Sequence, residues 1–149
     1  MFKSILISTA AAWLFLAAAM PALARNTVDN YPIAGALKSG EGADKIDPQI
    51  SLYFAGQDHP EVVSSLGNVA TNKKTSALGV NDEFACQRAF LSALIQLQAR
   101  AKLDGADAVI DIVSNYKNNE RASATEFTCG AGALMAGVAL KARLVKLQK

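Results

Sequence analysis

Helical periodicity is the clearest pattern in the chain and lies between residues 82 and 104. Apolar side chains recur there at helical spacing and share one face: Cys86, Phe90, Ala93, Leu94, Leu97 and Ala101. Asn81 or Asp82 can cap the start, and Gly105 suits the left-handed position after the last turn. We expect one long helix with a second apolar edge (Phe84, Leu91, Ile95) and an opposite polar face: Arg88, Ser92, Gln96 and Arg100.

Alternation of apolar and polar residues predicts strands on both sides of this helix. Four segments have strand-like patterns: 50–55, 108–113, 124–129 and 138–144. Residues 62–75 suggest a further strand, which Gly67 and Asn68 weaken, and we expect 72–75 to be a solvated loop. The order β-β-α-β-β-β predicts an α+β fold, with one main helix packed on a small, mostly antiparallel sheet.

The first 24 residues have the pattern of a secretory signal peptide. Lys3 precedes an apolar run of about 15 residues, and Ala22-Leu23-Ala24 is the small-x-small pattern that signal peptidase needs. The run is shorter than the roughly 20 residues that span a bilayer; a retained anchor is the alternative. We expect cleavage after Ala24, an extended polar entry segment over 25–48, and a single α+β domain over 49–149.

The charge of the mature chain limits its partners. The 149 residues carry a net charge of +2, which falls to +1 when Lys3 is removed with the predicted signal peptide. A nearly neutral domain has no long-range field to gather nucleic acid or acidic lipid. We therefore expect no nucleic-acid partner and, because no cysteine lies near the cleavage site, no membrane anchor after cleavage.

The two cysteines predict a disulfide. Cys86 lies on the helix face that must meet the sheet, and Cys129 alternates in phase with Thr125 and Phe127 on its predicted strand. An exported protein passes through an oxidising compartment, where two facing thiols close. Two buried free thiols are the alternative interpretation.

Candidate cofactor and metal sites are weak. The glycine-rich run 130–137 lacks the dinucleotide fingerprint, and a strand rather than a helix is expected after it, so we expect no nucleotide and no other cofactor. His59 is the only histidine and would give, with Asp58 and Glu61, a weak metal site at most. We favour an exposed loop residue and assign no metal ligand.

The hypothesis that the protein is an enzyme depends on carboxylate side chains. Asp111 lies within an apolar strand pattern, and we favour a structural pairing of this residue with Lys141 or Arg143. The alternative is an envelope enzyme that uses Asp111 or Glu126 for acid–base chemistry. No histidine lies near either cysteine in sequence, so we assign no catalytic residue and lean toward a protein that is not an enzyme.

Two cationic, amide-rich segments form the candidate partner surface. Their residues are Asn72, Lys73 and Lys74 in one predicted loop, and Asn115, Tyr116, Lys117 and Asn118 in the other. Solvated turns are the alternative. If the fold brings the two segments together, they would form a patch that recognises anionic groups or a glycan. The expected partner is an envelope protein or a glycan.

A set of short segments spread over most of the mature chain carries a family resemblance: residues 54–57, 59–60, 72–75, 82–86, 89–94, 115–119, 129–132 and 136–140. Together they resemble a group of small bacterial periplasmic proteins often labelled "excinuclease ATPase subunit". A true excinuclease ATPase is many times longer and has Walker loops and cysteine-rich zinc modules, which this sequence lacks. The resemblance therefore implies a periplasmic protein and not an excinuclease ATPase.

A second resemblance concerns the fold. The helix, residues 105–110 and the late Cys129-Gly130 pair are similar to the envelope-stress lipoprotein of the Rcs system and to YbjQ-type domains, which place a helix against a small sheet. This chain departs from the lipoprotein in lacking a lipidation cysteine. We expect an exported soluble periplasmic domain with a non-catalytic binding role in the cell envelope; the alternatives are the carboxylate enzyme and the weak metal-binding protein.

The predicted signal peptide gives a direct test. Mass spectrometry of the protein from a periplasmic fraction should find an N-terminus at Arg25, because the residues before it form the cleavage pattern. An intact Met1 in the membrane fraction would contradict this prediction.

Overall fold

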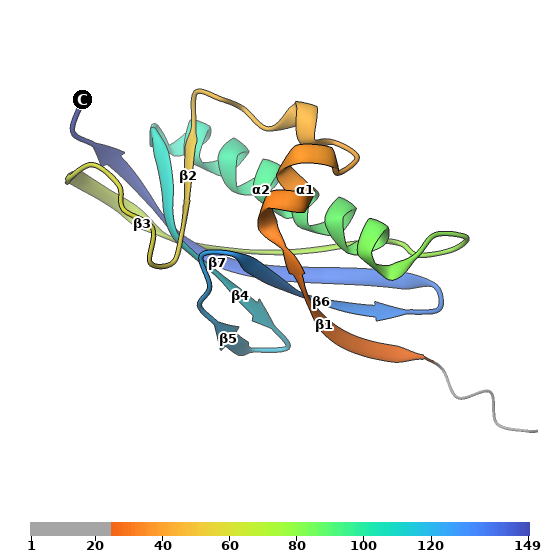
Figure 1. Cartoon of the computed structure of the whole chain (residues 1–149). Helices are drawn as coiled ribbons and strands as arrows, with labels where there is room; N and C mark the ends of the chain where they lie inside the picture. Colours follow the sequence, from red (N-terminus) through yellow and green to blue (C-terminus); the bar gives the residue numbers. More distant parts are fainter. Residues whose placement is uncertain (1–24) are drawn as a thin grey trace, which may run out of the picture.

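Seven strands form one mixed sheet, and the helices lie against one of its faces (Figure 1). The structure is a computed structural model that describes residues 25–149. The predicted signal peptide and its cleavage site after Ala24 lie outside the described residues. An α+β fold with one main helix is confirmed.

The elements follow one another along the chain in this order: β1 Asn26–Pro32, α1 Ile33–Ser39, the 3₁₀ helix η1 Ala43–Lys45, β2 Ser51–Phe54, β3 Val62–Ser76, α2 Asp82–Asp104, β4 Ala108–Tyr116, β5 Asn119–Arg121, β6 Glu126–Gly132 and β7 Met135–Leu147.

Strand β7 is the centre of the sheet. β3 pairs with it in antiparallel fashion along one side, from Val62 opposite Leu147 to Ser76 opposite Met135. The other side of β7 is shared: β6 pairs near its start and β4 near its end. β1 then adds to β6, β2 adds to β4 in parallel, and the short β5 pairs with the end of β4.

The predicted order of elements is wrong at its start, and it also lacks the short strand β5 after the long helix. Residues 25–48, expected to be an extended entry segment, contain β1, α1 and η1. β1 is polar and mostly exposed, and it joins the sheet through backbone pairing with β6, so apolar alternation could not reveal it. α1 buries Ile33 and Ala36, and Gly40 directly after it lies against Leu91, the one residue of the second apolar edge of α2 that is fully buried.

Residues 72–75 form strand and not the predicted loop. β3 runs without a break from Val62 to Ser76, with register shifts between Val62 and Ser64 and between Ser65 and Gly67. Gly67 has a φ of 114°, which a glycine adopts without strain, so the residue that weakened the strand pattern supplies a bulge within the strand. Polar side chains are tolerated here because β3 lies at the sheet edge.

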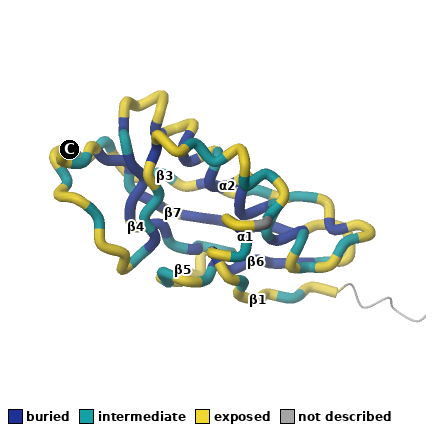
Figure 2. Tube along the Cα trace, turned by 45° about the horizontal axis from the view of Figure 1, so that its top comes forward, coloured by how far each residue is buried: buried dark blue, intermediate teal, exposed yellow. Residues whose placement is uncertain are grey.

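The long helix has the predicted bounds. The Asn81 side chain caps it by accepting a hydrogen bond from the Phe84 N–H at 2.8 Å, and Gly105 ends it in the left-handed conformation. Its apolar face meets the sheet, where the Phe90 ring stacks on Phe127 with ring centroids 4.0 Å apart. Figure 2 shows that the buried residues lie where α2 faces β7.

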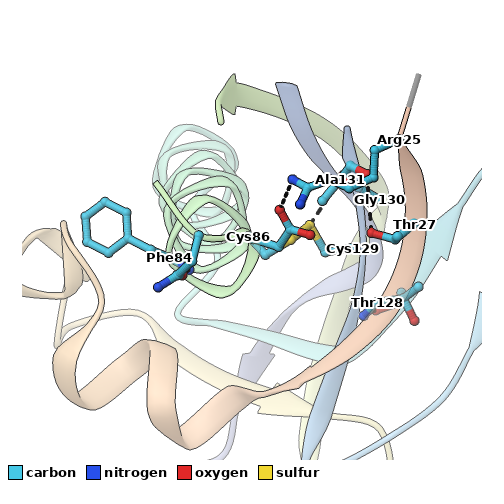
Figure 3. The surroundings of a disulfide bond; sticks show 11 residues. Arg25, Thr27, Phe84, Cys86, Thr128, Cys129, Gly130 and Ala131 are labelled. Carbon is cyan, nitrogen blue, oxygen red and sulfur yellow. Dashed lines mark hydrogen bonds and ion pairs between the residues drawn. A yellow bond between two sulfur atoms is a disulfide. The ribbon is translucent and has the colours of Figure 1, made fainter. Parts of the chain in front are cut away.

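The predicted disulfide between Cys86 and Cys129 is confirmed. It joins the first turns of α2 to β6, with 5.8 Å between the two Cα atoms (Figure 3). Both cysteines are buried. The bond therefore closes a long loop across the helix–sheet interface.

Loss of this disulfide should destabilise the domain strongly. The two cysteines are 43 residues apart, and the entropy of closing such a loop corresponds to about 4 kcal/mol. In a urea titration, the free energy of unfolding of Cys86→Ala/Cys129→Ala should be lower than that of wild type by most of this amount. Reduced wild-type protein should behave similarly; a loss below about 1 kcal/mol would contradict the prediction.

Candidate functional site

The sheet face that the helices leave uncovered is called here the open face (Figure 1). Side chains alternate along each strand, so residues opposite core positions of β7 point toward α2 and their neighbours point to the open face. Asn72 lies opposite Ala139 and Lys74 opposite Gly137, which places both on the open face. Lys73 lies opposite the core residue Val138, so it lies on the helix side.

The second predicted segment folds as a tight hairpin. Lys117 and Asn118 connect β4 to β5, and their φ values of 51° and 61° are those of the two-residue turn that suits the twist of a hairpin. Asn tolerates this left-handed conformation because its short polar side chain bonds locally. The turn places Lys117 and Asn118 over the open face of β7.

The fold brings most of the predicted partner surface together. A hollow of about 320 Å³ is lined by Asn72 of β3 and by Asn115, Lys117 and Asn118 of the hairpin, above Ala139. Residues about 40 positions apart thus share one shallow site, which we call the amide hollow. Lys73 is excluded from it, whereas Lys74 and Tyr116 line a neighbouring hollow of about 400 Å³.

Tyr116 explains one glycine of the run 130–137, Gly130. A Cβ atom at Gly130 would lie 1.9 Å from the Tyr116 hydroxyl oxygen, so the ring rests on the bare backbone there. The Lys117 ammonium lies 5.6 Å from the ring centroid, within the range of a cation–π interaction. A glycine inside a strand pattern is the sequence signal for such close approach.

A second hollow of about 480 Å³, called here the charged hollow, contains two ion pairs. Arg143 donates to Asp111 at 2.9 Å, and Lys141 lies 3.4 Å from Glu120. The predicted pairing of Asp111 with one of two cations is thus confirmed, with Arg143 as the partner. Asp111 lies at a break in the β4–β7 register and has a φ of 52°, which turns it outward from an otherwise buried strand.

The residues of the alternative carboxylate and metal sites do not come together in the fold. Glu126 pairs with Arg121 at 2.8 Å and lines neither the amide hollow nor the charged hollow, so it does not join Asp111. The His59 ring lies edge-on to Tyr53 with centroids 5.5 Å apart, and it is half-buried rather than fully exposed. Over residues 25–149, no group of three or more His, Cys, Asp or Glu is placed to hold a metal ion.

No helix within the described part of the chain is long and apolar enough to span a membrane. Comparison of the chain with protein-family models, curated proteins and solved structures finds no match. The resemblances given above therefore stay predictions.

The contact between Tyr116 and Gly130 gives a stability test. Gly130→Ala should lower the free energy of unfolding by about 1–2 kcal/mol, because the new methyl group displaces the Tyr116 ring. Gly137→Ala is the matched control: its Cβ would lie 3.4 Å from the Lys74 Cγ and 3.8 Å from the Tyr116 ring, which are tolerable contacts. Equal losses for both variants in chemical denaturation would contradict the prediction.

Proposed function

We propose that this chain is an exported, non-catalytic binding domain of the cell envelope, and that its partner docks on the open face at the amide hollow. The observation that carries the proposal is the meeting of Asn72 with Asn115, Lys117 and Asn118 in one hollow. The partner is an envelope protein or glycan with hydrogen-bonding or anionic groups.

The chemistry of the amide hollow suits recognition. Each Asn side chain offers both donors and an acceptor, and those of Asn72, Asn115 and Asn118 make no hydrogen bonds within residues 25–149. Lys117 has no carboxylate within ion-pair distance in the same part of the chain. The three amides are therefore available to a ligand without breaking an internal hydrogen bond, and Lys117, whose ammonium group contacts the Tyr116 ring, is available without breaking an ion pair.

The adjacent charged hollow extends the same surface. Ala70 lines both hollows, so they are neighbours along β3. Asp111 and Glu120 each have 56% of their side-chain surface exposed and are paired with a cation. A catalytic carboxylate usually has a desolvated or like-charged environment, so these two support binding rather than acid–base catalysis.

Capture of the partner tests the proposal. A tagged domain would be cross-linked in an envelope extract, and Asn72→Ala/Asn115→Ala/Lys117→Ser should capture at least tenfold less partner than wild type. Its free energy of unfolding should stay within about 0.5 kcal/mol, since these are surface changes. Treating the extract with protease or with periodate shows whether a protein or a glycan is bound.

The control is Lys38→Ser, which removes the same charge from an exposed position in α1, on the helix side of the sheet. It should capture as much as wild type. Unchanged capture by the triple variant would contradict binding at the amide hollow. An equal loss of capture in both variants would show that the net charge of the protein, and not the amide hollow, determines capture.

A further inference from the structure

Strand β3 is an edge strand whose outer side is open. It pairs with β7, and no second strand within the described residues pairs with it. In an antiparallel pair every second residue turns its N–H and C=O groups away from the partner strand. These outward groups of β3 take part in no other backbone hydrogen bond over residues 25–149.

The second half of this edge is regular enough to accept another strand. Both register shifts of β3 lie before Asn68, and the pairing with β7 then continues without interruption to Ser76. A stretch of this length matches an ordinary strand. Residues 68–76, called here the free edge, therefore present an unbroken row of backbone donors and acceptors.

Helix α2 forms a wall beside the free edge. The polar face of the helix runs along it in the opposite direction, because Arg88 donates to the Thr75 hydroxyl at 3.0 Å and Gln96 bonds to Thr71. A hollow of about 290 Å³ lies between strand and helix, beside Gln96 and Arg100. Another of about 210 Å³ lies beside Thr75 and Arg88 and is also lined by Glu41, Gly42 and Lys45. Strand and helix thus border a groove in which an added strand would contact both.

The groove carries an excess of positive charge. Arg88 and Arg100 lie near Glu41 and Asp104, at 3.7 Å and 2.8 Å. Lys73, on the helix side of the free edge, and Lys74, on the other side, have no carboxylate within ion-pair distance among the described residues. An occupant with acidic side chains would supply the missing partners.

We propose that an extended, acidic segment of a partner protein adds to residues 68–76 of β3 as a further antiparallel or parallel strand and lies in the groove beside α2. Backbone hydrogen bonds to the free edge give affinity, and the polar side chains of α2 with Lys73 and Lys74 select the sequence. This surface adjoins the amide hollow at Asn72, but it uses the outward backbone groups of β3 and not the side chains of the amide hollow.

A second copy of the chain fits this edge less well. Symmetric antiparallel pairing of the two free edges would centre on Asn72 and place Lys73 diagonally next to Lys73 of the other copy. Like charges at such positions oppose pairing. Lysines on an edge strand are also a common protection against self-association, and the same two charges attract an acidic strand.

Designed peptides test the proposal without altering the protein. A fluorescent peptide of alternating threonine and glutamate should bind at least tenfold more tightly than the threonine–lysine peptide, and added salt should weaken it. Alternate amides of a bound peptide strand face β3 and the others face away from it. N-methylation of the amides that face β3 should abolish binding, and N-methylation of the others should leave binding unchanged. Hydrogen exchange at residues 68–76 should slow when the peptide binds.

Protein variants separate this site from the open face. Lys73→Ser/Lys74→Ser should weaken the glutamate peptide at least fivefold, while Lys117→Ser, which belongs to the amide hollow, should leave its affinity unchanged. Equal binding of the two peptides, equal effects of the two N-methylated sets, or a peptide-free dimer protected at residues 68–76 would each overturn the proposal.

Discussion

The packing of α2 on β7 is the contact on which the rest of the structure depends. β7 is apolar toward the helix from Ala136 to Leu144, and α2 presents small residues with Phe90, Leu94 and Leu97. Phe90 stacks on Phe127 of β6, and the disulfide fixes the start of the helix to the same strand. Since β3, β4 and β6 all pair with β7, their positions relative to the helix follow from this one interface.

One-sided packing explains why the functional surfaces are polar. With the helices on one face, the other face carries a small apolar cluster at one end, built on Ala108, Ile110 and Val145. The remainder of the open face is free to carry amides, a hairpin and paired charges. The hydrophobic requirement of the fold is met on the helix side, so polar side chains on the open face cost little stability.

The pairing of three strands with β7 produces the hollows of the open face. β6 and β4 share one side of β7, and the end of β4 runs past its pairing with β7 and forms the hairpin with β5. Tyr116 then lies over Gly130, where the bare backbone admits the ring. The same long β7 supports β3 along its full length and leaves the outer side of that strand open.

The sequence by itself determined the elements whose signals are local. The bounds of α2 follow from Asn81, Gly105 and apolar spacing, and the disulfide follows from two cysteines in phase with buried faces. It also pointed to Asp111 as a paired residue in an apolar strand.

Tertiary structure decided what depends on contacts between distant residues. β1 and residues 72–75 are polar strands, held by backbone pairing that no side-chain pattern records. Lys73 and Lys74 lie on opposite faces of the sheet. Which face each lysine takes depends on the register of β3 with β7, since a shift of one residue would exchange them. The meeting of Asn72 with Lys117 required the sheet itself, because strands distant in sequence become neighbours only when β7 lies between them.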